Sequence, residues 1–273
     1  MGLRVNNNIA AFNSYRNLQA TDKTLNSSLE KLSSGLRINK AADDAAGLVI
    51  SEGLRSQIGG LTVAARNAQD GVNVIQTADG ALNTSTTILQ RMRDLTVQAE
   101  NATNSTESLT AIKGEMDELA KELTRISDNT SFNGVKLLDG SFAGKFQVGD
   151  KNADSISVTV SQDFDATGLA VSGLDVTTAG GRTAAETAID AALKKVNSAR
   201  ASLGAQQNRF ENVISSINVA VENLTASESA IRDTDMAKEM TKFSKSQILS
   251  QAGTSMLAQA NSASQNVLSL LRG

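Results

Sequence analysis

The sequence contains no cysteine, histidine, proline or tryptophan, and its only aromatic side chains are one tyrosine and seven phenylalanines in 273 residues. Without cysteine and histidine, disulfides, thiolate nucleophiles, imidazole metal ligands and imidazole general bases are excluded. Catalysis would have to rest on carboxylates, lysine, serine or tyrosine. With so few aromatics, a core must be built from Leu, Ile, Val and Ala, which favours long helices that pack along narrow seams.

Long hydrophobic runs are also missing. No stretch approaches 18 uninterrupted apolar residues, and the first residues lack the apolar segment of a cleavable secretory signal. We therefore expect neither membrane insertion nor export by an ordinary signal peptide. The absence of cysteine fits a reducing cytosol and an extracellular location equally well, so composition leaves the location open.

The charge is uneven along the chain. The formal net charge is −3, but residues 1–42 carry +4 and residues 235–273 carry +2, which leaves −9 for the middle. Nucleic-acid binding would require denser clusters of Lys and Arg together with aromatic platforms. We interpret the basic ends as polar helix faces and expect no nucleic-acid partner.

Apolar residues recur at steps of three and four through most of the chain, which predicts long amphipathic helices. The clearest run, from Ile189 to Ile231, amounts to about six heptads of coiled-coil seam. Similar runs predict one helix over about residues 57–100 and another around residues 109–126, and Asn101–Thr106 offers a turn between them. The pattern predicts a mainly α fold, an elongated antiparallel helical bundle.

Three polar residues, Arg200, Gln207 and Glu228, interrupt the longest seam. Polar seam residues can fix the register of paired helices at some expense of stability. Partial exposure where the helices splay apart is an equally good explanation, and the sequence leaves both open.

The pattern changes between residues 132 and 181, where eight of the 20 glycines fall. Residues 155–160 alternate between polar and apolar side chains, residues 146–148 offer a partner strand, and Asp139-Gly140 and Gly149-Asp150 mark turns. This region predicts a small β-hairpin region appended to the bundle.

Both ends of the chain are amphipathic helices whose polar faces are rich in Asn, Ser, Gln and Thr, which are mediocre helix formers. If the two ends paired only with each other, they would leave apolar side chains exposed outside the seam, and such a stripe marks an interaction surface. We therefore expect the ends to order when copies of the chain associate, as a closed bundle or an open polymer. The predicted polymerisation seams are Ile9, Phe12, Leu25, Leu29, Leu32, Met236, Met240, Phe243, Leu249, Leu257 and Val267.

Several motifs occur in this order along nearly the whole chain: Ser33–Asn39, Ala42–Leu48, Phe132–Leu138, Leu203–Phe210 and the closing Leu270-Leu271-Arg272. Together they resemble bacterial flagellin. Two small departures are Gly273 after the arginine that often ends the family, and the opening Met1-Gly2-Leu3. Neither threatens the resemblance.

The resemblance implies termini that pair as an α-helical coiled coil in the filament core, and a helical-bundle domain with a β-hairpin on its outer side. Flagellins often carry large outer domains, whereas only about 50 residues separate Phe132 from the last bundle helix here. A short form with core and bundle domains only is expected. Its divisions are residues 1–43 and 233–273 for the terminal coiled-coil domain, and residues 44–131, 132–181 and 182–232 for the bundle helices, hairpin region and last bundle helix.

The resemblance also implies function, location and partners: a non-enzymatic subunit that polymerises into the flagellar filament and transmits motor torque for swimming. Such chains leave the cell unfolded through the flagellar type III apparatus, and the filament is extracellular. The implied partners are the chain itself, an export chaperone, and the cap and hook–filament junction proteins. No cofactor is implied.

Resemblance further implies a contact site at Gln90, Arg91, Leu95 and Glu115. The matching positions in flagellins contact neighbouring subunits along the filament and the flagellin-sensing Toll-like receptor of hosts. From the pattern alone, the same stretch is a polar helix surface with Leu95 turned inward. The closing residues Leu270, Leu271 and Arg272 resemble the segment that cytosolic inflammasome receptors sense.

Metal and catalytic sites are not expected. Asp43-Asp44 has no convergent third ligand in the sequence, and acidic residues are usual at the start of a helix. The metalloprotease domain found in some flagellins needs His-Glu-x-x-His, which a chain without histidine cannot supply.

Two classes of protein other than a flagellin-like filament subunit are considered. A hook–filament junction protein resembles flagellin near the N-terminus, but here the C-terminal half fits flagellin too. A coiled-coil signalling module would need a membrane anchor or sensory domain, and neither is visible.

Overall fold

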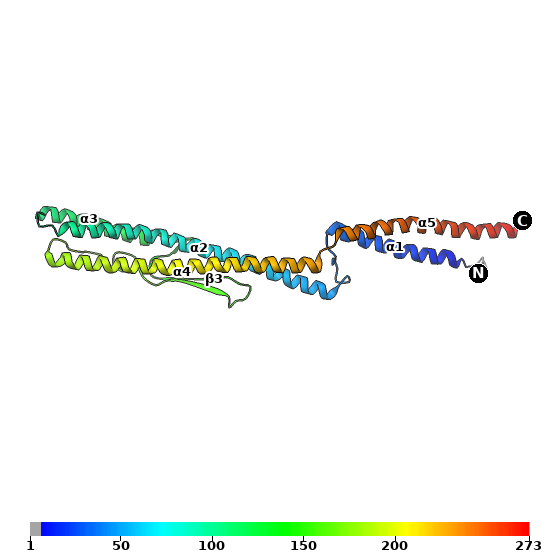
Figure 1. Cartoon of the computed structure of the whole chain (residues 1–273), viewed down its shortest axis with the longest axis horizontal. Helices are drawn as coiled ribbons and strands as arrows, with labels where there is room; N and C mark the ends of the chain where they lie inside the picture. The colour runs from blue at the N-terminus through cyan, green and yellow to red at the C-terminus, as the bar shows by residue number, and fades with distance from the viewer. Residues whose placement is uncertain (1–6, 273) are drawn as a thin grey trace. The chain divides into compact units, whose positions relative to one another are not determined.

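The computed structural model describes the backbone of residues 7–272 and the side chains of residues 7–263. The chain divides into two compact units. We call residues 57–222 the bundle unit, and the residues up to Ser56 together with those from Asn223 the terminal unit. The elements are α1 (Ile9–Ser34), α2 (Ala45–Ala99), α3 (Thr106–Asn129), β1 (Ser131–Phe132), β2 (Val135–Lys136), β3 (Phe142–Gln147), β4 (Ser155–Val160), α4 (Ala179–Arg232) and α5 (Met236–Arg272) (Figure 1).

The predicted mainly α fold with small β-hairpins is confirmed. The turn predicted at Asn101–Thr106 separates α2 from α3, where the Asn104 side chain donates to the main-chain oxygen of Gln98 and the Ser105 hydroxyl caps α3 by accepting from the Ser108 N–H. Helix α2, however, begins at Ala45, well before the predicted start near residue 57. The reason is local, because Asp44 accepts a hydrogen bond from the Gly47 N–H at 2.9 Å and so caps the first turn.

Within the bundle unit, α2 and α4 run antiparallel, with α3 folded back beside α2 (Figure 1). Contacts between α2 and α4 follow this direction: Gly71 meets Phe210, Asp79 meets Arg200, and Arg93 meets Asp190. Each helix turns its apolar stripe inward, as its period predicts.

Helix α2 has one unusual stretch. Residues 84–87 are Thr, Ser, Thr and Thr, and all four hydroxyls donate to the main-chain oxygen four residues earlier. Such hydrogen bonds compete with the backbone ladder and often accompany bending of a helix.

The strands form two separate antiparallel pairs, β1 with β2 and β3 with β4. Residues 155–160 pair with residues 142–147, so the predicted partner residues Phe146 and Gln147 lie in β3. Alternate residues of β4, Ile156, Val158 and Val160, are buried. This alternation is the one read from the sequence, and it packs the hairpin onto the helices.

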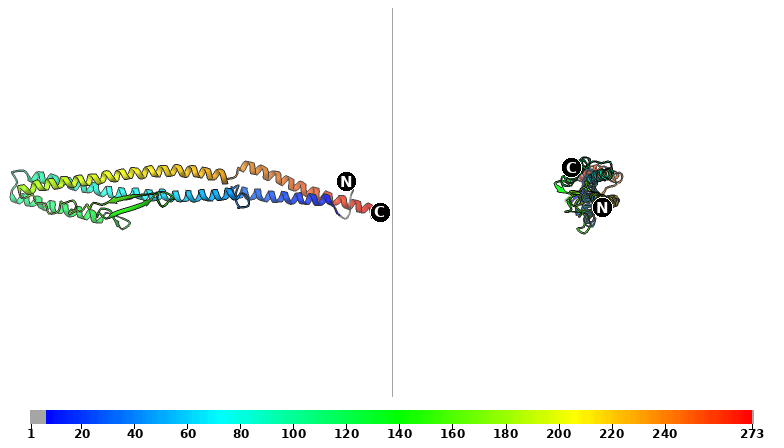
Figure 2. Two further views of the ribbon diagram at one scale, coloured as in Figure 1. Left: turned by 90° about the horizontal axis from the view of Figure 1, so that it is seen from below. Right: turned by 90° about the vertical axis from the view of Figure 1, so that its left-hand side faces the viewer.

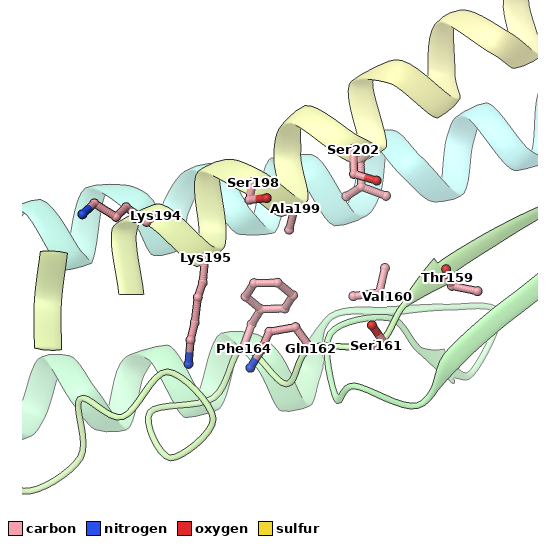
Figure 3. A pocket seen from close by; sticks show the side chains of 11 residues that line it. Thr159, Val160, Ser161, Gln162, Phe164, Lys194, Lys195, Ser198, Ala199 and Ser202 are labelled. Carbon is pink, nitrogen blue, oxygen red and sulfur yellow. The ribbon is translucent and has the colours of Figure 1, made fainter. Parts of the chain in front are cut away.

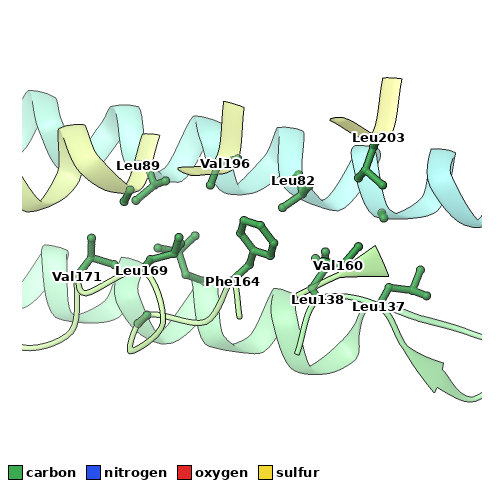
Figure 4. Packing of buried hydrophobic residues seen from close by; sticks show 14 of the residues in the cluster. Leu82, Leu89, Leu137, Leu138, Val160, Phe164, Leu169, Val171, Val196 and Leu203 are labelled. Carbon is green, nitrogen blue, oxygen red and sulfur yellow. The ribbon is translucent and has the colours of Figure 1, made fainter. Parts of the chain in front are cut away.

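The core of the bundle unit lies between the helices, the hairpin and the segment that follows β4. Phe164 is 1% exposed and points between α2 and α4, beside Leu82 and Val196 (Figure 4). Leu137 and Leu138 enter the same core from the loop before β3. Helix α4, which contains the predicted last bundle helix, thus covers one side of the core. Loop residues before β3 and after β4 fill the rest of it.

Phe210 is a second anchor of this core. It is fully buried, its ring lies edge-on to Phe146 with centroids 5.6 Å apart, and a Cβ at Gly71 would come within 2.8 Å of it. Glycine at position 71 therefore lets the ring seat against the backbone of α2.

The terminal unit contains α1 and α5, which lie side by side and run in opposite directions (Figures 1 and 2). Asn8 caps α1 by accepting from the Ala11 N–H, and Gly35 ends it in the left-handed conformation with φ of 74°. These are the ordinary start and stop devices of a helix.

Replacing Phe210 with alanine should lower the free energy of unfolding of the bundle unit by about 3–5 kcal/mol, because it removes a fully buried ring and leaves a cavity. Urea titration followed by circular dichroism measures the change. Val219→Ala on the same helix, at a side chain that is 55% exposed, is the control and should change stability by less than about 1 kcal/mol. Equal effects of the two substitutions would contradict this account of the core.

Candidate functional site

The two units bury their apolar side chains very differently. Among the described residues, every buried apolar side chain except Ile38 belongs to the bundle unit. Most of the large apolar side chains that are exposed belong instead to the terminal unit: Ile9, Phe12, Tyr15, Leu29, Val49, Ile50, Met236, Met240, Ile248, Leu249 and Met256. The terminal unit therefore exposes large apolar side chains to solvent, whereas the bundle unit buries most of its own.

The predicted polymerisation seams fall into two groups. The exposed ones are Ile9, Phe12, Leu29, Met236, Met240 and Leu249. The half-buried ones, which lie nearer the junction of α1 and α5, are Leu25, Leu32, Phe243 and Leu257. Val267 and the closing Leu270, Leu271 and Arg272 belong to α5, but they lie outside the residues whose side chains are described.

The surface between α1 and α5 is polar. Ser28 is fully buried and donates to Glu239 Oε1 at 2.5 Å, and Ser250 donates to Asp22 Oδ1 at 2.9 Å. The Asn8 side-chain amide donates to the main-chain oxygen of Ala260 at 2.9 Å. The two helices thus satisfy each other's polar groups but leave many large apolar side chains exposed, which is the exposure expected for ends that pair only with each other.

The connectors of the terminal unit, residues 35–44 and 233–235, are tied together by main-chain hydrogen bonds. The Arg37 N–H donates to Arg232 O at 2.6 Å, and the Thr234 N–H donates to Gly35 O at 2.9 Å. The Arg232 side chain, 11% exposed, forms an ion pair with Glu52 at 2.6 Å. Residues of the Ser33–Asn39 motif therefore bond to the end of α4 and to the connector that follows it. We call this region, residues 35–44 and 232–235, the joint.

Ile38 anchors this joint and explains the Ala42–Leu48 motif. A Cβ at Gly47 would lie 2.7 Å from Ile38 Cδ1 and 2.5 Å from Asp44 Oδ2, so a larger residue there would displace both side chains. Asp43 Oδ2 accepts from the N–H groups of Lys40 at 3.0 Å and Asn39 at 3.1 Å. The acidic pair therefore caps a loop and a helix start, and these hydrogen bonds hold the pKa of Asp43 below its ordinary value.

The residues of the predicted receptor-contact site lie on α2 and α3. Arg91 and Glu115 form an ion pair with 2.6 Å between Nη2 and Oε1, and both are about half exposed. Gln90 is exposed beside them, whereas Leu95 is 1% exposed and packs in the core. The structure thus brings Arg91 and Glu115 together and turns Leu95 inward, as the helical period predicts.

The polar seam residues have different roles. Arg200 Nε lies 2.8 Å from Asp79 Oδ1 on α2, and this hydrogen bond raises the pKa of the guanidinium above its ordinary value. Both side chains are partly exposed, at 31% for Arg200 and 42% for Asp79. The two explanations of a polar seam residue, pairing between helices and partial exposure, therefore both apply to Arg200. Gln207 donates to Glu211 on its own helix instead, and Glu228 is half-buried.

A groove of about 490 Å³ lies between the end of β4, the segment after it and α4 (Figure 3). Phe164 and Val160 form its apolar side, and Lys194 and Lys195 stand at its rim. Lys195 donates to Gly168 O at 3.1 Å and so closes the neighbouring loop. The hydroxyl groups that line the groove come from Thr159, Ser161, Ser198 and Ser202. No carboxylate that could act as a base lines the groove.

In the part of the chain whose side chains are described, no group of three or more acidic residues is arranged to hold a metal ion. The same part contains no helix long and apolar enough to cross a membrane.

The pattern of residues did not identify the cross-helix partners. The helical period identifies the apolar seams, but it does not show which helices face each other. The partners of polar groups depend on this, as in the pairs Arg200 with Asp79, Arg93 with Asp190 and Asp22 with Ser250. One signal was present, since Asp79 and Arg200 interrupt their two seams with opposite charge.

These features describe a long helical chain whose terminal helices expose large apolar side chains. Comparison with known proteins agrees: the bacterial flagellin N-terminal helical region matches residues 5–143, and the bacterial flagellin C-terminal helical region matches residues 187–271. The chain belongs to the bacterial flagellin family. It is therefore a structural subunit of the flagellar filament, which self-assembles and serves motility, and it is not an enzyme.

Similar proteins of known name match nearly the whole chain, and a similar solved structure matches about half of it. The flagellin of Bacillus subtilis (strain 168) is 46% identical over 305 aligned positions, which cover 99% of this chain and all of that protein. The flagellin of Halalkalibacterium halodurans is 47% identical over 270 positions, covering 98% and 99%. The crystal structure of Bacillus cereus flagellin matches with a TM-score of 0.50 and 29% identity, over 56% of this chain and 88% of that one.

The hydrogen bonds to Asp43 predict how the joint responds to acid. Because the pKa of Asp43 is lowered in the folded chain, its contribution to stability is fully present above the unfolded pKa of about 3.9 and is lost as the pH falls below it. Wild type should therefore be more stable than Asp43→Asn near neutral pH, and the difference should shrink below about pH 4. Thermal unfolding of both proteins across this range measures it. The exposed Asp70→Asn serves as a control, and a difference that stays constant with pH would refute the assignment.

Proposed function

We propose that the apolar side chains exposed on α1 and α5 are the surface through which copies of this chain polymerise. The observation that carries this proposal is the contrast in burial: only Ile38 is buried among the described apolar residues of the terminal unit, whereas Phe12, Met240 and Met256 are more than half exposed. A second copy seated against these side chains would remove them from water, which stabilises association by about 25 cal/mol per Å² of apolar surface.

The remaining expectations extend this proposal. Residues 1–43 and 233–273 form the terminal coiled-coil domain of the filament core, and residues 44–131, 132–181 and 182–232 form the bundle domain around it. The chain leaves the cell through the flagellar type III apparatus and acts outside it. A chaperone covers the apolar ends before export, and the cap and hook–filament junction proteins meet the same surfaces at the filament ends. Support comes from the exposed faces of α1 and α5, which require cover before assembly.

Replacing Met240 and Leu249 with serine should raise the concentration needed for polymerisation at least about tenfold, because each side chain is worth about 1.5–3 kcal/mol when buried in the filament. Sedimentation and electron microscopy measure polymer formation. Val135→Ser, at a similarly exposed residue of the short strand β2, is the control and should polymerise as wild type does. If the α5 variant assembles like the control, these faces are not the polymerisation surface.

We also propose that Gln90, Arg91 and Glu115 contact neighbouring subunits along the filament and, in free subunits, a host Toll-like receptor. The support is that Arg91 and Glu115 hold each other in a defined exposed geometry across α2 and α3, with Gln90 beside them. Leu95, being buried, holds α2 in place behind this surface instead of touching the partner. The closing Leu270, Leu271 and Arg272 are proposed as the segment sensed by inflammasome receptors.

Arg91→Ala should weaken receptor binding by the free subunit about tenfold or more, since it removes a charged hydrogen-bonding group from the contact. Filaments should bind less than free subunits, because the neighbouring subunit covers the site. Titration of the purified receptor ectodomain against each form measures this. Arg125→Ala, which removes a similar exposed ion pair elsewhere on α3, is the matched control. Equal binding by wild-type subunit, Arg91→Ala and filament would refute the proposal.

A further inference from the structure

The pairing of α1 with α5 has an unusual composition. Among the described residues, the only buried side chain of α1 is Ser28, and the only buried side chain of α5 is Ser246. Large apolar residues on both helices are half-buried or exposed. In the described part of the pair, no apolar side chain is therefore buried deeply enough to fix by itself how the two helices are aligned along their length.

Four contacts between the helices follow one antiparallel register. Ser28 meets Glu239, Asp22 meets Ser250, and Asn8 meets Ala260, so each step backward along α1 is a step forward along α5. Between the second and third of these, Gly253 faces Leu18, where a Cβ on residue 253 would lie 3.8 Å from the Leu18 Cβ.

We infer that the three hydrogen bonds from Ser28, Ser250 and Asn8 set the register of α1 against α5, and thereby determine which apolar pattern the terminal unit presents to a second copy. This inference rests on the proposed polymerisation surface. It assigns assembly to residues that face inward and would touch no neighbouring subunit.

The physical reason is the difference between polar and apolar contacts. Half-buried apolar side chains pack nearly as well after a shift of one helical turn, about 5.4 Å, because apolar contact has little directionality. A hydrogen bond is lost by the same shift. Glu239, whose side chain is 14% exposed, would then lose the Ser28 hydroxyl and keep only Lys242, whose Nζ is 3.6 Å away.

The register has a direct consequence for the outer surface. It places Met240 at the level of Leu29, and Met256 at the level of the stretch from Phe12 to Tyr15. All of these side chains are at least half exposed. A shift of one turn would move the apolar side chains of α5 past those of α1, and a neighbouring copy would no longer meet the same combined surface.

The test uses the absence of cysteine from the chain. Leu18→Cys with Gly253→Cys reports the native register, since the Cβ separation of 3.8 Å suits a disulfide. Leu18→Cys with Leu257→Cys reports a shift of about one turn along α5. Each pair is placed in the otherwise wild-type full chain and in Ser28→Ala/Ser250→Ala. The intrachain disulfide is scored on non-reducing gels, in soluble and polymerised fractions.

In Ser28→Ala/Ser250→Ala we expect several-fold less disulfide for the native pair, more for the shifted pair, and a polymerisation concentration about tenfold higher. The matched control is Ser244→Ala/Ser255→Ala, at exposed serines of α5, which should behave as wild type. Forming the native disulfide in Ser28→Ala/Ser250→Ala should restore polymerisation, because it imposes the register that the hydrogen bonds no longer hold.

Unchanged disulfide yields in Ser28→Ala/Ser250→Ala would overturn the inference, as would a shifted register with unimpaired polymerisation. If the variant fails to polymerise and the native disulfide does not rescue it, the loss has another cause and the inference is also wrong. Failure of the proposed function is separable: the variant with serine at Met240 and Leu249 would then polymerise as wild type does, while the disulfide yields would still report the register.

Discussion

The unequal burial of apolar surface is the constraint on which the rest of this structure depends. The bundle unit encloses its Leu, Ile and Val side chains between two long antiparallel helices, a third helix and a hairpin, with Phe164 and Phe210 as the largest anchors. The terminal unit encloses almost none and holds its helices together with hydroxyl, amide and carboxylate groups. Buried apolar surface, which stabilises the fold, is therefore concentrated in the bundle unit, and most large exposed apolar side chains belong to the terminal unit.

Helical period was a sufficient guide to most of this fold. The seam from Ile189 to Ile231 lies in α4, and the alternation over residues 155–160 forms β4, because burial on one face imposes a period that is visible in the sequence. The start of α2 does not follow from the period, because the helix begins with the small residues Ala-Ala-Gly, which show no apolar period. It depends instead on one capping side chain, Asp44.

Sites were harder to predict than elements. Period alone turned Leu95 inward, and it is buried. The pairing of Arg91 with Glu115 could not be read from spacing, because it requires α3 to fold back beside α2 at a particular height. The same holds for Ser28 with Glu239, which are separated by 211 residues in sequence. A pattern shows which face of a helix is buried, but the partner of a polar group depends on the arrangement of the whole unit.

Most ion pairs among the described residues lie on the surface, where solvent screens them and each contributes little to stability. Their use is geometric: Arg93 with Asp190 and Arg200 with Asp79 connect α2 to α4 at two heights. These cross-links and the hydrophobic core together hold the helices at a constant alignment.

The four consecutive hydroxyl residues of α2, Thr84 to Thr87, have a mechanical consequence. Each of them shares a main-chain oxygen with the backbone ladder, so the ladder can lengthen there at less cost than where no hydroxyl competes. Helix α2 has 55 residues, and these four lie in its C-terminal third, where they form a compliant segment. Under a bending load, curvature concentrates in the most compliant segment, and the rest of the helix stays straight.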